Sequence, residues 1–114
     1  MSEADKRYID VQSALARVGG NEGLYKRLLG KFETSIDIAK FNEDIDTKNY
    51  VEAGEIVHAA KGVAGNLSLT VFFAASSKLM DQLRNGGTPN DEDVALFRQL
   101  FDETKSAVNA YLGV

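Results

Sequence analysis

The sequence contains one histidine, His58, and the residues around it at helical spacing have the clearest capacity for chemistry. Lys61 follows one helical turn later with Gly62 beside it, and Gly54 and Gly65 lie one and two turns from His58. Each glycine inside a helix costs up to ~1 kcal/mol relative to alanine. We therefore expect a partner to approach this face closely and to meet His58 there.

Several kinds of catalytic site lack the residues that they need. The chain has no cysteine and no second histidine, and Glu55-x-x-His58 occurs once, whereas a di-iron bundle requires two such motifs. It also has no Gly-x-Ser-x-Gly elbow, no P-loop and no kinase motifs. We therefore expect no metal or cofactor in this chain, no serine hydrolase chemistry and no ATP-dependent kinase activity.

Nucleophilic catalysis by the imidazole is the chemistry that remains. A histidine can attack phosphorus and hold a phosphoryl group as a phosphoramidate. That role needs a ring that reaches solvent, a nearby cation and a low surrounding surface. Lys61 provides the cation, and Gly54, Gly62 and Gly65 provide the low surface. A solvated surface histidine without a chemical role is the alternative that the spacing leaves open.

Length and charge narrow the class of protein further. With 114 residues the chain is expected to form a single domain, residues 1–114, of which residues 1–8 are expected to be a loosely ordered segment. The formal net charge is -4 and the isoelectric point is about 4.9, which argues against nucleic acids and anionic membranes as partners. No apolar run approaches the ~20 residues of a membrane span, and the polar N-terminus is not a signal peptide. A cytoplasmic location is the expectation.

The apolar spacing is helical throughout the chain. It predicts a short helix over residues 9–18, ended by Gly19 or Gly20, and a long one after an N-cap at Asn21 that continues to about residue 45. Further helices are predicted over 48–65, with Asp46 or Thr47 as N-cap, over 69–85, and from Thr88 or Asn90 to the end. Short loops join antiparallel neighbours, so the predicted fold is all-α: an antiparallel up-down-up-down four-helix bundle with a short extra N-terminal helix.

The motif around the histidine resembles that of a known family. His58-x-x-Lys61-Gly62, followed by Ala64-Gly65-Asn66-Leu67, is similar to the histidine phosphotransfer (HPt) domain of bacterial two-component phosphorelays, whose pattern is approximately His-x-Leu-Lys-Gly-x-Ala/Ser-x-x-Leu-Gly. The likeness covers nearly the whole chain from Ile9, and it includes the following upstream and downstream residues: Ile9-Asp10, Ala14-Leu15, Val18-Gly19-Gly20-Asn21, Leu24-Tyr25, Leu28-Leu29, Phe32, Leu79, Leu83 and Gly86.

The sequence departs from the family pattern at three positions. Ala60 stands where leucine is usual, and Ser68 stands where the motif ends in glycine. Some members carry a glutamine on the following helix that hydrogen-bonds near the active histidine, and Met80 occupies the position that aligns with it. Arg84, one turn on, is the residue that we expect to reach the phosphoryl group instead.

The resemblance implies a phosphoryl carrier. His58 would accept a phosphoryl group at Nε2 from the aspartate of a receiver domain, such as that of a hybrid histidine kinase, and pass it to a response-regulator receiver. Mg²⁺ and most catalytic groups would belong to the receiver, and Lys61 would stabilise the phosphoryl charge. The residues expected to form an apolar docking patch are Ala59, Val63, Val11 and Ala14.

Two alternatives accompany this interpretation. One is an HPt-like adaptor that binds receivers without phosphotransfer, which a buried His58 would favour, as would a Lys61 that fails to reach the imidazole. The other is the phosphoryl acceptor domain of a chemotaxis-type kinase, which normally sits in a much longer chain. Because the sequence starts with Met1 and finishes in a predicted helix, we expect a free-standing protein, although a domain excised from a longer chain would have the same features.

Overall fold

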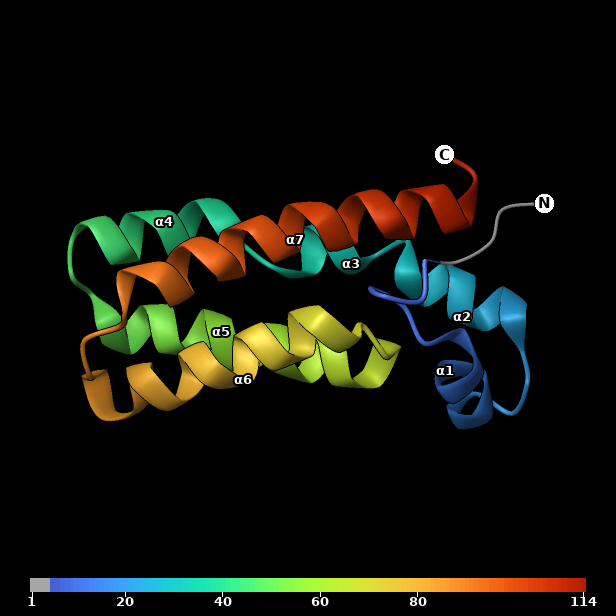
Figure 1. Ribbon diagram of the computed structural model, residues 1–114, viewed down its shortest axis with the longest axis horizontal. Helices are drawn as coiled ribbons and strands as arrows, with labels where there is room; N and C mark the ends of the chain where they lie inside the picture. The colour runs from blue at the N-terminus through green and yellow to red at the C-terminus, as the bar shows by residue number, and fades with distance from the viewer. Residues whose placement is uncertain (1–4) are drawn as a thin grey trace.

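A computed structural model describes residues 5–114, and within this range every regular element is a helix, as the predicted all-α class requires. Figure 1 shows α4 to α7 running along the long axis of the molecule, with α1 and α2 at one end. The elements are α1 (Val11–Arg17), α2 (Glu22–Leu29), α3 (Phe32–Ser35), α4 (Ile38–Asp46), α5 (Tyr50–Leu67), α6 (Thr70–Leu83), the 3-10 segment η1 (Arg84–Gly86) and α7 (Asp91–Leu112).

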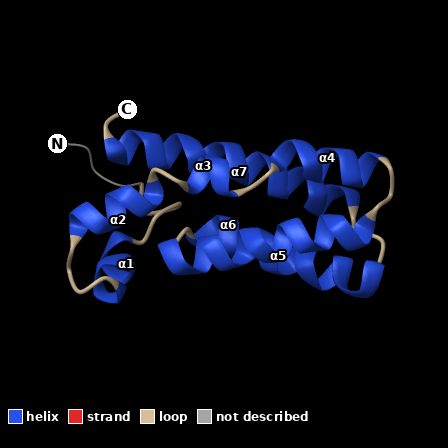
Figure 2. Ribbon diagram, turned by 180° about the vertical axis from the view of Figure 1, so that it is seen from behind, coloured by secondary structure: helices blue, strands red, loops and turns tan. Residues whose placement is uncertain are grey.

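The single long helix predicted over residues 22–45 is wrong, because this stretch is divided into α2, α3 and α4 (Figure 2). α2 ends at Gly30, and the extended backbone of Ile36 (φ -122°, ψ 117°) separates α3 from α4. Asp37 is the N-cap of α4, and its carboxylate accepts a hydrogen bond of 2.9 Å from the backbone nitrogen of Lys40. The apolar spacing continues through this break, so the period alone did not reveal the new helix start.

Two asparagine caps agree with the sequence. The side chain of Asn21 accepts a hydrogen bond of 3.0 Å from the backbone nitrogen of Leu24 at the start of α2. Asn90, rather than Thr88, is the N-cap of α7, and its side chain accepts a hydrogen bond of 2.8 Å from the backbone nitrogen of Glu92. Both caps satisfy amide groups that the first helical turn leaves without partners.

α5 carries His58, and both of its ends differ from the prediction. Its N-cap is Asn49 instead of Asp46 or Thr47, because α4 continues to Asp46 and has Thr47 as its C-cap. Lys48, between the two helices, takes a left-handed conformation (φ 60°). At the other end the helix continues to Leu67, where Ser68 adopts a left-handed conformation (φ 56°, ψ 44°) and ends it. The histidine therefore lies near the middle of an 18-residue helix.

A cluster of aromatic rings joins the long helices. The rings of Phe41 in α4 and Phe97 in α7 are 4.8 Å apart between centroids, and Phe72 in α6 lies 5.2 Å from Phe97. The cluster extends toward α3 through Phe101, whose ring centroid is 5.9 Å from that of Phe72. The Phe32 ring in α3 lies 5.5 Å from the Phe101 ring. Tilted rings at these separations add to the stability that comes from burying their apolar area. The cluster joins α4, α6 and α7, and α5 packs against α6 and α4.

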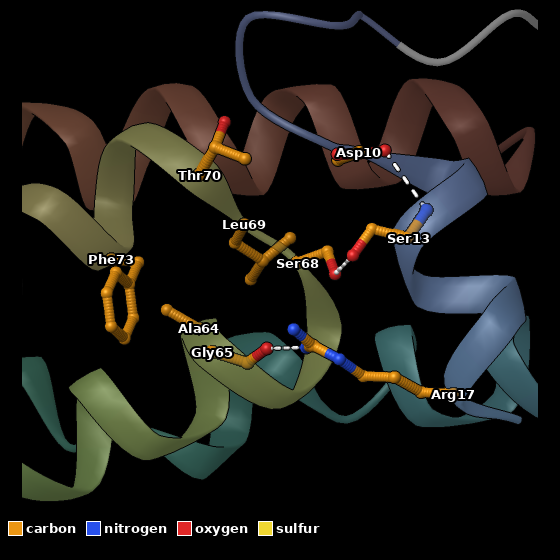
Figure 3. A pocket seen from close by; sticks show the side chains of 9 residues that line it. All are labelled: Asp10, Ser13, Arg17, Ala64, Gly65, Ser68, Leu69, Thr70 and Phe73. Carbon is orange, nitrogen blue, oxygen red and sulfur yellow. Dashed lines mark hydrogen bonds between the residues drawn. The ribbon is translucent and has the colours of Figure 1, made fainter.

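α1 packs against the turn between α5 and α6 (Figure 3). The backbone nitrogen of Asp10 donates a hydrogen bond of 2.9 Å to the carbonyl of Ser68, and the guanidinium of Arg17 donates one to the carbonyl of Gly65. The cation of Arg17 thus lies at the negative end of the α5 dipole, where α5 has no basic residue of its own. A pocket of about 230 Å³ remains between α1 and this turn.

Part of the segment predicted to be loosely ordered makes defined contacts. Within residues 5–8, the Tyr8 hydroxyl donates a hydrogen bond of 2.6 Å to Glu103 of α7, and the backbone nitrogens of Tyr8 and Ile9 donate to the carbonyl of Asp5. Residues 1–4, for which the same prediction was made, lie outside the described residues.

None of the helices that the structure describes combines the length and the apolar character needed to cross a bilayer.

Candidate functional site

His58 is exposed on the outer face of α5. Its neighbour Val57 is fully buried, and so is Ala60 two residues on, so the helix is held by its inner face. Successive residues on a helix are about 100° apart, which turns the imidazole away from the core toward solvent. The structure assigns no core role to the ring, and an external reactant can reach it.

The glycines near His58 have different surroundings. A Cβ at Gly62 would meet no atom within 4 Å, so this position faces open space. A Cβ at Gly54 would lie 3.6 Å from Leu83, and one at Gly65 would lie 3.2 Å from the ring of Phe73. Gly54 and Gly65 therefore allow α6 to pack closely on α5, and only Gly62 matches the expectation of an open approach for a partner.

Lys61, one turn beyond His58, leans toward α6. Its Nζ lies 6.0 Å from the centroid of the Phe73 ring, within the range of a cation–π interaction. The apolar spacing of the helix predicted over residues 69–85 includes both Phe72 and Phe73, but only Phe72 lies in the core. Phe72 is fully buried and Phe73 is 39% exposed, because successive side chains on a helix point about 100° apart.

A groove of about 440 Å³ lies beside His58, between the first half of α5 and the end of α6. Most of its lining is apolar, and its only ionisable residues are Glu55 and His58. Val51 is the most exposed large apolar residue within a helix of the described chain, at 62%. The groove, called the α5–α6 groove below, is lined by Val51, Gly54, Met80, Leu83 and Gly86, with Glu55, His58 and Asn85 as its polar residues.

The predicted docking residues are not gathered around His58. Ala59 is exposed and Val63 is half-buried on the outer part of α5. Ala14 is buried, with 1% exposure, and so contributes to the core rather than to a surface patch. Val11 is half-buried on α1, and the start of α1 packs against Ser68. Ser68 is ten residues from His58, which corresponds to about 15 Å along the α5 axis.

Arg84, which we expected to reach a phosphoryl group, has a different partner. Its guanidinium lies 3.3 Å from the carboxylate of Asp81 in an ion pair whose side chains are both well exposed. Exposed pairs of this kind contribute little to stability. Arg84 is not among the residues that line the α5–α6 groove.

Among residues 5–114 the structure brings together no group of three or more histidine, cysteine, aspartate or glutamate side chains able to hold a metal ion. The site presents an exposed imidazole, with Lys61 one helical turn away on α5.

Two features near the histidine were missed from the sequence. Val51 and Met80, which form walls of the groove, come from different helices, so their proximity depends on how α5 and α6 pack. Phe73 beside Lys61 follows Phe72 directly in the sequence, and which of the two rings lies in the core depends on the rotation of α6 against its neighbours.

Comparison of the chain with protein-family models, with curated proteins and with solved structures finds no match in any of the three.

Proposed function

We propose that this protein is a histidine phosphotransfer protein that carries a phosphoryl group on His58 between receiver domains. The observation that carries the proposal is the position of the only histidine: exposed, near the middle of α5, one turn from Lys61 and beside the open surface at Gly62. The sequence motif from His58 to Leu67 supports the same function. A four-helix up-down bundle built from α4 to α7 and a cytoplasmic location belong to this proposal.

The proposed reaction is a transfer between two proteins. The imidazole Nε2 lone pair attacks the phosphorus of an aspartyl phosphate, the N–P bond forms, and the P–O bond to the aspartate breaks. The aspartate leaves as a carboxylate with the electron pair, and the ring loses its Nδ1 proton to solvent. The reverse reaction passes the group to a second receiver. Mg²⁺ would be held by the receiver, and this chain would need neither ATP nor a cofactor.

Lys61 has a defined part in the proposal. One turn from His58, its ammonium group is close enough to offset the charge of a phosphoryl group on the ring. Phe73 restrains the Lys61 side chain on the α6 side of the histidine. Gly62 leaves room on the adjacent surface for the receiver backbone to approach.

A non-catalytic adaptor is the second candidate, and one observation favours it. The described contact of Lys61 is with Phe73 rather than with the imidazole. The exposure of His58 favours the carrier instead, because an adaptor has no need of an accessible nucleophile.

The test is to mix the protein with receiver domains labelled on aspartate in the presence of Mg²⁺ and to follow acid-labile, base-stable label. We expect label on the wild-type protein and none on His58→Gln, with nearly equal melting temperatures for the two proteins, since the ring is exposed. If the wild-type protein binds receivers but acquires no label, the adaptor function is favoured over the carrier function.

A further inference from the structure

The α5–α6 groove is apolar next to a residue that is proposed to bind a charged group. Its apolar lining includes Val51, Gly54, Met80 and Leu83. Leu83 is buried, but Val51 is 62% exposed. An apolar side chain exposed to this extent, within reach of a reactive residue, is a typical feature of a surface that is covered during function.

The proposed reaction determines what covers the groove. The phosphorus of the partner must come within about 3.5 Å of the imidazole nitrogen for the transfer to occur. Because His58 itself lines the groove, a protein that brings an aspartyl phosphate to His58 must also place its neighbouring surface over the groove. The occupant is therefore part of the same receiver.

The charged residues on the two sides of His58 differ, and this difference indicates where the phosphoryl group of a docked receiver would lie. Lys61 lies on the C-terminal side of His58, where its ammonium group attracts a phosphoryl anion. On the other side, no lysine or arginine lines the groove, and Glu55 is one of its lining residues. The anion is thus favoured on the Lys61 side and disfavoured on the groove side, which leaves the groove to an uncharged, apolar group.

We propose that the α5–α6 groove binds an apolar side chain that the receiver domain carries beside its phosphorylated aspartate. This inference rests on the proposed phosphotransfer function, and it assigns to Val51 and Met80 a part in selecting the receiver. The contact forms on docking and stabilises the docked complex and the transition state equally, so it affects affinity and leaves the rate within the complex unchanged.

Val51→Asn tests the proposal directly. Valine and asparagine have similar helix propensities, and the position is largely exposed, so the fold is retained. Leu96→Asn is the matched control, because Leu96 is an apolar residue on α7, 40% exposed, that does not line the groove. Gly54→Ala is an independent variant that adds a methyl group to the groove surface, at an ordinary contact distance of 3.6 Å from Leu83.

The measurement is single-turnover transfer from a labelled receiver domain to His58 at increasing receiver concentration. We expect the half-saturating receiver concentration to rise about tenfold for Val51→Asn and also to rise for Gly54→Ala. The maximal rate of both variants should equal that of the wild-type protein. Leu96→Asn should match the wild-type protein in both quantities. If both groove variants match the wild-type protein, the groove inference is overturned while the phosphotransfer function stands. If no receiver labels the wild-type protein, the phosphotransfer function fails, and the groove inference fails with it.

Discussion

The ammonium group of Lys61 lies over the aromatic ring of Phe73, with 6.0 Å between Nζ and the ring centroid. This contact crosses from α5 to α6 and holds the lysine one turn from His58 on the side away from the α5–α6 groove. The arrangement gives the exposed imidazole a positively charged neighbour on one side and an apolar surface on the other.

Lys61→Ala is expected to slow phosphoryl transfer to His58 by about tenfold, because the phosphoryl charge loses a cation that is only partly screened by water. Phe73→Leu keeps the ammonium group but removes the aromatic ring that restrains it, and an exposed cation–π contact contributes about 0.5–1 kcal/mol. We therefore expect a decrease of less than about fivefold for Phe73→Leu. Rapid-quench measurement at saturating receiver gives both rates, and an unchanged rate for Lys61→Ala would remove the lysine from the mechanism.

Gly62 and Gly65 are expected to respond oppositely to alanine. Gly62→Ala places a methyl group in open space and should stabilise α5 by up to about 1 kcal/mol through the higher helix propensity of alanine. In Gly65→Ala the methyl group would lie 3.2 Å from the Phe73 ring, which must move, so most of that gain should be lost. Urea denaturation of the two variants measures the difference, and equal stabilisation would contradict the packing described for Gly65.

Gly62→Leu separates the needs of the fold from those of docking. We expect the melting temperature to stay near that of the wild-type protein, because the leucine side chain extends into solvent. Receiver binding should weaken at least tenfold, because the larger side chain occupies the surface that the partner must approach. Titration calorimetry with a receiver domain provides the measurement. Unchanged affinity would show that partners do not approach at Gly62.

Ser68 ends α5 in a left-handed conformation (φ 56°, ψ 44°), and this predicts a stability order for two variants. Ser68→Gly and Ser68→Ala both lose the 3.4 Å hydrogen bond between the hydroxyls of Ser68 and Ser13, but only glycine adopts this conformation without steric cost. We expect Ser68→Gly to be more stable than Ser68→Ala by about 1 kcal/mol in urea denaturation. The opposite order would mean that α5 does not end in this way.

The sequence predicted the parts of the fold that depend on local chemistry. The cap at Asn21 and the helical spacing around His58 follow from side chains near in sequence, and the structure has both features. For the last helix the sequence left Thr88 and Asn90 as alternative N-caps, and the structure has Asn90. The break at Ile36–Asp37 was not predicted, because an apolar period that continues across a loop hides the change of helix.

The surroundings of the histidine were predicted less well, because they depend on contacts between helices. The spacing of Gly54, Gly62 and Gly65 is visible in the sequence, but which of them faces α6 depends on the rotation of α5 against its neighbour. The exposure of Val51 and its proximity to Met80 depend on the same packing. A pattern on one helix contains no information about the distance to the next helix.

Asp93, in the first turn of α7, is expected to make the stability of the protein depend on pH in the acidic range. The hydrogen bond from the Gln82 side chain, followed by the ammonium group of Lys78 at 3.4 Å, lowers the pKa of this carboxyl below its ordinary value of 3.8. A carboxyl group with a lowered pKa in the folded state stabilises the fold above the unfolded pKa. That contribution is lost as the pH falls through the folded pKa, because the folded protein must then bind the proton too.

Asp93→Asn should therefore have a lower melting temperature than the wild-type protein at pH 7, and the difference should narrow as the pH falls below about 3.8. Asp91→Asn is the matched control, because Asp91 is exposed in the same helical turn. Thermal unfolding followed by circular dichroism between pH 2 and pH 7 provides the comparison. If the difference in melting temperature between Asp93→Asn and the wild-type protein stays constant across this range, the contacts of the ionised Asp93 carboxylate with Gln82 and Lys78 of α6 do not stabilise the fold.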